Sequence, residues 1–328
     1  NSFLWQGCSY CLVFCFTVSY SYMAQESTLG NASLSELLQL KAQYDLQKNI
    51  LFRTAVIGQL LGKDDLGFVG IDGKEYPIPS YEDIEKKIKE QEEMFTKKAG
   101  EGFVKLILVP VGMRLGVLIE KYKQVLLTHL REGALLATKK LQDDPDEPIE
   151  LDGDKPIWVW DGFVEADTND LLLYYPQEFS VQNHNGKTKR QLLADGHGWN
   201  VLLIEYLPNI PREGRGENVN GRRQLEAGRS PREYLKTIQS DPSYAHERGF
   251  SIEDQLVYSI THMEETNQIM NDWEGHGSSA FQLGAYMTDG DSVPVVSYGR
   301  GYMRAGIVRL AADFRGPIYG ARTEVVIM

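Results

Sequence analysis

The spacing of apolar residues changes near Lys155, and this change constrains the fold more than any other feature of the sequence. Before Lys155, apolar residues recur at intervals of three and four, the period of an amphipathic helix. After Lys155, short apolar runs lie between Gly, Pro, Asn and Asp, a pattern typical of strands and turns. The sequence therefore predicts an α+β protein: a helical N-terminal region, then a module with few short strands, two helices and long ordered loops.

The first part of the chain is predicted to contain helices over residues 33–62, 81–98 and 113–131. Ser33 precedes the first helix and Glu36 follows three residues later, which is the signature of a capping box. The block 143–154 is acidic, contains prolines and lacks periodicity, as is typical of a linker. We therefore predict a helical region over residues 23–150, including this linker, and a second domain over residues 151–328.

Strands are predicted in the second domain wherever an apolar run lies between turn residues. These runs are 157–160, 171–175, 201–206, 281–287, 293–298 and 325–327. One helix begins after Ser230, with Pro231 at its first position, and another begins at Ser251 and runs to about Asn271. The stretch 208–228 is irregular and rich in Gly, Arg and Asn, which predicts a long loop.

Residues 1–22 form an apolar N-terminal extension without Lys or Arg, so they lack the basic region of a secretory signal. The stretch is also too short and too rich in hydroxyl groups for a membrane span. We expect synthesis to begin at Met23, the alternatives being a degenerate signal or a surface anchor. The chain's cysteines, Cys8, Cys11 and Cys15, lie here without the fourth cysteine of an iron–sulfur site.

Composition and motifs disfavour several functional classes. The formal net charge of -12 opposes binding to nucleic acid or to anionic membranes. The sequence has no nucleophile elbow, no Gly-rich phosphate loop and no histidine pair at helical spacing, and His262 is expected to be structural. We predict no catalytic residue, cofactor or metal. The alternative is a metal-dependent oxidoreductase or hydrolase that uses His197 and the acidic residues of 167–170.

The C-terminal segment carries the most specific pattern. Its motif residues are Arg300-Gly301, then Arg309 and Ala311, then Pro317, and finally Gly320-Ala321-Arg322. This pattern resembles the closing segment of C-type-lectin-like domains of the formylglycine-generating-enzyme type, with Tyr302-Met303-Arg304 in place of that family's usual Gly-Ser-Trp. Catalytic members of the group use cysteines or a histidine-rich iron site, which this module lacks. The resemblance therefore implies a binding scaffold.

Within that group, the segment is most similar to variable proteins of diversity-generating retroelements, whose C-terminal codons are rewritten at adenines to diversify a ligand-binding surface. The composition points the same way, because no Lys follows Lys236 and no Asn follows Asn271. The codons of both residues begin with two adenines. Chance, together with a preference for Arg in a loop-rich domain, is the alternative. The resemblance implies a non-enzymatic binding protein with a hypervariable surface in roughly its last fifty residues.

Two sets of residues are expected to build that surface. The ligand-contacting residues, expected on one exposed face, are Val296, Ser297, Tyr298, Tyr302, Met303, Arg304, Ile307, Val308 and Asp313. Strand alternation turns some of residues 296–298 inward, and Val296 is the first that we expect to be buried. The framework residues, whose glycines fix turns and whose arginines bind backbone carbonyls, are Arg300, Gly301, Arg309, Gly320 and Arg322. The expected partner is a protein or cell-surface ligand, and the N-terminal helices are candidates for homo-oligomer contacts.

Overall fold

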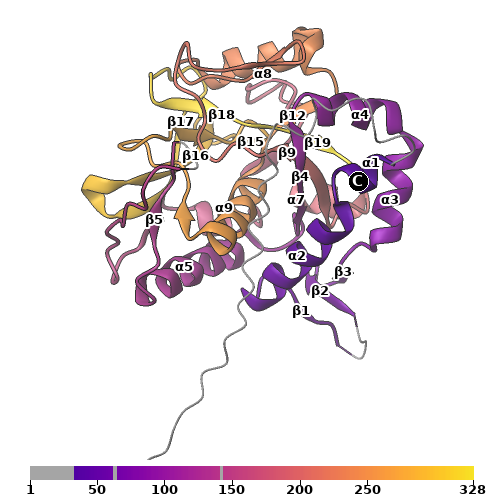
Figure 1. Ribbon diagram of the computed structural model, residues 1–328, viewed down its shortest axis with the longest axis horizontal. Coiled ribbons are helices and arrows are strands. Elements are labelled where there is room, and N and C mark those ends of the chain that lie inside the picture. The colour runs from indigo at the N-terminus through magenta and orange to yellow at the C-terminus, as the bar shows by residue number, and fades with distance from the viewer. Residues whose placement is uncertain (1–32, 62–64, 141–142) are drawn as a thin grey trace, which may run out of the picture. The chain divides into compact units, whose positions relative to one another are not determined.

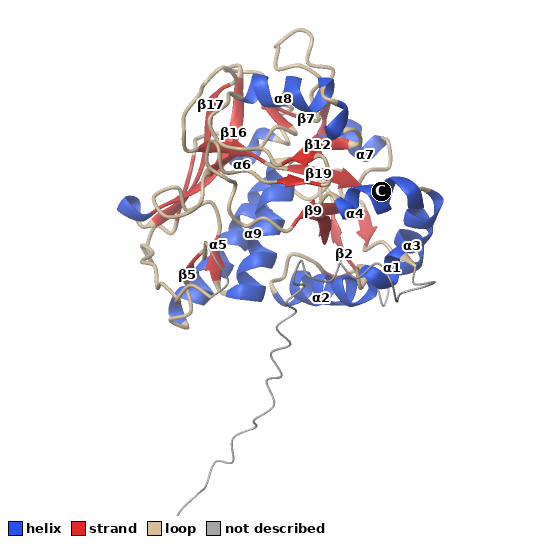
Figure 2. Cartoon of the chain, turned by 45° about the horizontal axis from the view of Figure 1, so that its top comes forward, coloured by secondary structure: helices blue, strands red, loops and turns tan. Residues whose placement is uncertain are grey.

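A buried helix, α9 (Ile252–Thr266), lies at the centre of the fold in the computed structural model of the chain (Figures 1 and 2). The structure describes residues 33–61, 65–140 and 143–328, and Leu34–Met328 form one compact unit. The predicted extension 1–22, with its cysteines, lies outside the described residues.

The start of α9 agrees with the prediction because Ser251 and Asp254 form a capping box. The Asp254 amide donates to Ser251 Oγ at 3.2 Å, and the Ser251 amide donates to Asp254 Oδ2 at 2.7 Å. The helix ends before the predicted Asn271, because Asn267 adopts a left-handed conformation with φ of 63°. Every residue from Ile252 to Met263 is buried, so neighbouring elements enclose this helix on all sides.

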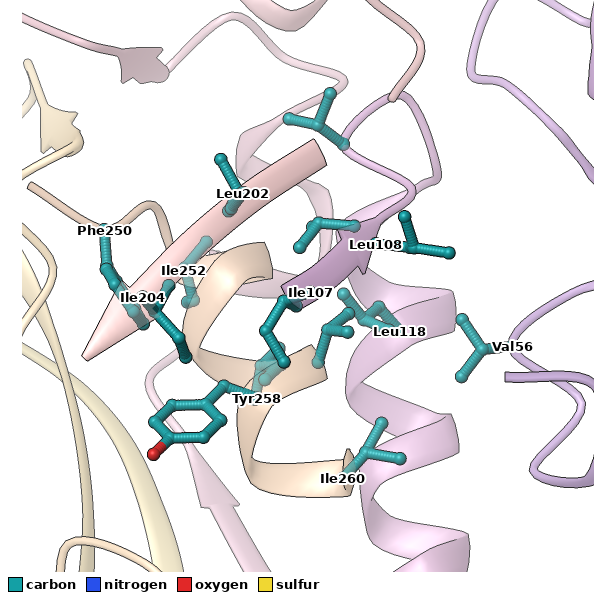
Figure 3. Packing of buried hydrophobic residues seen from close by; sticks show 14 of the residues in the cluster. Val56, Ile107, Leu108, Leu118, Leu202, Ile204, Phe250, Ile252, Tyr258 and Ile260 are labelled. Atoms are coloured by element: carbon teal, nitrogen blue, oxygen red, sulfur yellow. The ribbon is translucent and has the colours of Figure 1, made fainter. Parts of the chain in front are cut away.

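A four-stranded antiparallel sheet packs against α9 (Figure 3). Its strands, in spatial order, are β12 (Glu247–Gly249), β19 (Thr323–Val326), β9 (Asn200–Glu205) and β4 (Phe103–Val109). β4 and β9 are apolar and mostly buried, and Leu106 of β4 lies opposite Leu203 of β9. Figure 3 shows Ile107 and Ile204 from these strands close to Ile252 of α9. The sheet and the helix therefore bury their apolar faces together.

This sheet crosses the domain boundary that the sequence predicts at residue 150. β4 belongs to the predicted helical region, whereas its hydrogen-bonded neighbour β9 belongs to the predicted second domain. α2 (Leu40–Arg53) and α5 (Leu115–Arg131) also pack against α9 and share its hydrophobic core. The described residues therefore do not divide into 23–150 and 151–328, because the apolar run 103–109 is a strand whose partner lies far along the chain.

The second sheet is built around a hairpin of β16 (Ser292–Gly299) and β17 (Arg304–Ala311). The hairpin pairs Val296 with Ile307 and closes with Gly299 opposite Arg304. β6 (Ile157–Val159) runs parallel to β17 along its other edge. The other strands are β14 (Ser279–Phe281), β15 (Ala285–Met287), β18 (Tyr319–Ala321), β7 (Leu172–Tyr174) and β8 (Lys187–Thr188).

Each of the predicted apolar runs contains strand residues in the structure, and the run 281–287 is divided at Gly284 between β14 and β15. β17 is not among the predicted strands because Arg304, Gly306 and Arg309 interrupt its apolar pattern. The sheets with their covering helices confirm the α+β class.

The predicted helices are present, but two of them are interrupted and the first ends at Arg53, well before residue 62. Gln39, with a left-handed φ of 49°, separates α1 (Leu34–Leu37) from α2, and Gln91 separates α3 (Tyr81–Glu90) from α4 (Glu92–Gly100). α8 (Pro231–Ser240) begins after the predicted Ser230 cap. The shorter elements are α6 (Phe163–Ala166), α7 (Lys189–Ala194), η2 (Pro242–Tyr244), η3 (Arg300–Tyr302), β1 (Gly58–Gln59), β2 (Leu66–Val69), β3 (Glu75–Pro77), β5 (Leu136–Ala137), β10 (Asn218–Val219), β11 (Arg222–Arg223) and β13 (Gln268–Ile269). Within the described ranges, no helix combines the length and the apolar character needed to cross a membrane.

Candidate binding surface

One face of the β16–β17 hairpin belongs to the protein core. Val296, Tyr298 and Ile307 are each exposed by 1 % or less, and the Tyr298 hydroxyl donates to the carbonyl of Glu150. The three side chains share a face because Val296 opposes Ile307 and strand side chains alternate. This corrects the prediction that they contact a ligand. Val296 is buried, as the alternation of the strand led us to expect.

The turn that closes the hairpin is exposed. Tyr302 is 64 % exposed, Met303 is 39 % exposed, and Arg304 is half-buried. The guanidinium carbon of Arg304 lies 5.6 Å from the centre of the Tyr302 ring, which is a cation–π distance. Ser297 is half-buried and pairs with Gly306. These four predicted residues therefore lie near one end of the hairpin and are accessible to a partner.

Val308 and Asp313 do not belong to this end of the hairpin. Asp313 follows the opposite end of β17, where its carboxylate accepts a hydrogen bond from Arg232 Nε at 2.8 Å. Val308 packs against the second hydrophobic cluster. The hairpin has strands of eight residues, which extend for roughly 25 Å. The nine predicted residues therefore do not form one exposed face.

Two exposed tryptophans that were not among the predicted residues lie on the segment that runs beside β17. Trp158 and Trp160 are 44 % and 39 % exposed, and their ring centres lie 6.0 Å apart at 73°. Trp158 pairs with Gly306, and the Trp160 amide donates to the carbonyl of Ile307 at 2.9 Å. The alternation of Trp with Ile and Val over 157–160 was the signal, since a period of two places both rings on one face.

We use the name aromatic surface for the group formed by Trp158, Trp160, Ser297, Tyr302, Met303 and Arg304. Gly306 lies in the middle of this group. It pairs with Ser297 of β16 on one side and with Trp158 of β6 on the other. Because Gly306 carries no side chain, the sheet has a shallow depression between Ser297 and Trp158. Arg304 makes no ion pair with any described residue, so its charge is available to a partner.

A partly buried ionic contact holds the turn of the hairpin. Arg300 donates from Nε to Asp272 Oδ2 at 2.8 Å, and it also forms an ion pair with Glu147. The amide of Gly301 donates to Glu274 Oε2 at 2.7 Å. Arg300 thereby lowers the pKa of Glu147 through a hydrogen bond. The prediction that backbone carbonyls hold Arg300 is therefore wrong, because carboxylates from two distant segments reach its guanidinium first.

Of the other framework arginines, one departs from the prediction and one agrees with it. Arg309 forms an ion pair with Asp289 and not with carbonyls, which corrects the prediction. Arg322 behaves as predicted: it donates to the carbonyls of Leu207 and Pro208, and also to the side chains of Gln255 and Asn271. Burial lowers the pKa of Arg322 to about 10. Gly320 packs so closely that an added Cβ would lie 2.4 Å from Ile210 Cγ2.

The side chains of the alternative enzyme hypothesis are not brought together. His197 is exposed in a loop, whereas Asp167 is fully buried and binds Lys189 Nζ at 2.7 Å. His262 is buried in α9. In the described parts of the chain, no three His, Cys, Asp or Glu side chains are grouped so that they could hold a metal ion.

Comparisons with known proteins give no relative from which a function could be transferred. No protein-family model matches the sequence, and neither the curated proteins nor the solved structures include a match. The function must therefore be argued from the geometry of the aromatic surface and from the sequence pattern around it.

Proposed function

We propose that this chain is a non-enzymatic binding protein that contacts a protein or cell-surface ligand through the aromatic surface. The observation that carries the proposal is the exposure of two tryptophans, a tyrosine and a methionine beside Arg304, whose guanidinium lies over the Tyr302 ring. Trp, Tyr, Met and Arg are the residue types enriched at protein interfaces, where large rings bury much area with few rotatable bonds. A partner with apolar groups and a carboxylate would complement this composition.

The packing and ionic contacts beneath the aromatic surface support a role in binding. Val296, Tyr298 and Ile307 are core residues directly below it, and the Arg300 contacts with Asp272 and Glu147 hold the turn. Val293 and Val295, on the other face of β16, are buried in the second hydrophobic cluster, so only the end of the hairpin near the turn is free to vary. A surface of this kind can change its side chains without losing its shape.

We propose further that the chain is a variable protein of a diversity-generating retroelement, with a C-type-lectin-like fold in its C-terminal part. The motif of residues 300–322 and the absence of Lys and Asn from residues 272–328 support this proposal. So does the position of Ser297, Tyr302, Met303 and Arg304, since the segment expected to vary supplies exposed side chains. Trp158 and Trp160 would then be the constant part of the surface.

The DNA beside the gene tests the retroelement proposal. We expect a near-copy of the codons for the C-terminal segment, different only at adenines and adjacent to a reverse-transcriptase gene. The differing codons should include those of Tyr302, Met303 or Arg304 and should spare Val296 and Ile307. Absence of both the copy and the reverse transcriptase would refute the retroelement proposal.

A pair of libraries tests the binding surface separately. One library randomises Ser297, Tyr302, Met303 and Arg304, and the matched control randomises the buried residues 296, 298 and 307. Displayed variants are sorted for resistance to a protease, which measures the fraction that folds. We expect most of the first library and little of the control to survive. Equal losses in the two libraries would contradict the separation of a variable surface from its core.

A further inference from the structure

A cluster of buried ionisable side chains lies in the core, separate from the residues of the aromatic surface. Lys189, Asp167 and Glu253 are completely buried, and they come from α7, the end of α6 and the first turn of α9. Lys189 Nζ lies 2.7 Å from Asp167 Oδ2 and 2.7 Å from Glu253 Oε1. The Tyr174 hydroxyl donates to Glu253 Oε1 at 2.7 Å. An amine and two carboxyl groups are thus held in contact, shielded from the solvent.

The charges of this cluster do not balance. One ammonium group faces two carboxyl groups, and an unpaired negative charge in the core is costly, so the cluster favours keeping one extra proton. Burial raises the pKa of Glu253, which agrees with a neutral acid at this position. Asp167 Oδ1 and Glu253 Oε2 are buried and have no hydrogen-bond partner among the described residues. The cluster therefore contains a proton donor and carboxyl oxygens that no neighbour satisfies.

The surroundings of Asp167 favour attack on its carboxyl carbon. The amide of Leu115, the first residue of α5, donates to Asp167 Oδ2 at 2.7 Å. This amide and the positive end of the helix would stabilise negative charge on that oxygen. The carbonyl of Met113 accepts from Lys189 Nζ at 2.5 Å and holds the nitrogen beside the carboxyl group. The arrangement supplies a nucleophile in contact with its target and a donor for the developing oxyanion.

We propose that Lys189 and Asp167 join in an intramolecular amide bond, with Glu253 moving the protons. Glu253, which holds the extra proton, first gives it to Asp167 Oδ1 and then takes a proton from Lys189 Nζ, whose neutral amine attacks Asp167 Cγ and forms the C–N bond. Oδ2 carries the negative charge against the Leu115 amide, while Glu253 transfers a second proton from Nζ to Oδ1. The Cγ–Oδ1 bond then breaks and one water molecule leaves. An ammonium and a carboxylate thus become an amide and water, with no oxidant or other reactant.

The bond would close a covalent loop from residue 167 to residue 189, which contains β7 and β8. It would fix the end of α6, which follows Trp160 after a short turn, to α7. The inference is independent of the proposed binding function, since it rests on no residue of the aromatic surface.

Mass spectrometry of the denatured full chain tests the bond directly. We expect the mass to fall short of the sequence mass by one water, about 18 Da. Trypsin should release a branched peptide that joins residues 188–190 to the peptide containing Asp167, because an acylated Lys189 is not cleaved. A folded wild-type protein with the full sequence mass and no branched peptide after prolonged incubation would overturn the proposal.

Three variants separate this bond from other losses of water. Lys189→Met and Glu253→Gln should both restore the full mass, the first by removing the nucleophile and the second by removing the proton carrier. Lys98→Met is the matched control, because Lys98 is also buried and binds Glu101 and Glu247 at 2.7 and 2.8 Å; it should keep the mass deficit. A deficit that persists in Lys189→Met would come from another reaction, such as succinimide formation at an Asp–Gly step, and would refute the proposal.

Discussion

Acidification should destabilise the protein through His262, and the size of the effect follows from its surroundings. His262 is buried in α9, with the rings of Tyr206 and Tyr258 centred 6.3 Å from its own. Its Nε2 lies 3.4 Å from Thr266 Oγ1, and no residue that the structure describes forms a hydrogen bond with its Nδ1. Burial, reinforced by the positive charges of Lys105 and Arg322, lowers the pKa of His262 to about 3. The folded protein therefore keeps this imidazole neutral where an exposed histidine would be charged.

The sign of the effect follows from proton linkage. Between pH 6.5 and pH 3 the unfolded chain binds a proton at His262 and the folded chain does not, so stability falls as the pH falls. Each pH unit in this window costs about 1.4 kcal/mol. From pH 7 to pH 4.5 the contribution of His262 should therefore decrease the free energy of unfolding by about 2.5 kcal/mol.

Urea unfolding of the wild type and of His262→Gln at both pH values measures this contribution. Buried carboxyl groups also titrate, and the raised pKa values of Glu253 and Glu324 act in the opposite direction. They are present in both proteins, so the difference between the two free energies isolates His262. We expect the wild type to lose about 2.5 kcal/mol relative to the variant on acidification. A difference that stays constant between the two pH values would refute the assignment of a buried neutral imidazole.

Other substitutions test the two faces of the hairpin and its framework, each by urea unfolding. Ile307→Ala should lower the free energy of unfolding by about 2–5 kcal/mol through a cavity, whereas Tyr302→Ala should change it by less than about 0.5 kcal/mol; equal effects would contradict the assigned burial. Arg322→Ala should cost about 3–5 kcal/mol, because several buried acceptors lose their donor, and a change below about 1 kcal/mol would show that water replaces it. Met303→Gly should raise stability by up to about 1 kcal/mol and Met303→Val should lower it, since φ at this residue is 51°; the reverse order would contradict the left-handed turn.

Local signals in the sequence predicted the local structure well. Ser230 with Glu233, and Ser251 with Asp254, form the capping boxes that begin α8 and α9. Such contacts involve residues three positions apart, so the sequence contains all the information that they need. The apolar runs likewise predicted the positions of strands, because a run between turn residues is a local pattern.

Features that depend on distant residues were not predicted. β4 is a short apolar run between two helical regions, and only its pairing with β9 distinguishes it from part of a buried helix. The domain boundary failed for the same reason. The partners of Arg300, Asp272 and Glu147, are far from it in sequence, and Glu147 lies in the block interpreted as a linker. The composition identified that block correctly as acidic. It could not show that Glu147 forms an ion pair with Arg300.

The conformation of Met303 bears on what the exposed turn is for. A residue with a side chain loses roughly 1 kcal/mol in the left-handed region, where Gly or Asn would fit with less strain. Met303 nevertheless occupies it, with φ of 51°, while its side chain is 39 % exposed and contributes little to the core. Stability alone therefore does not explain a methionine here. The proposed contact with a partner would explain it, since Met adapts to surfaces of different shape. The same reasoning applies to Trp158 and Trp160, whose large rings remain exposed although burial would stabilise the fold.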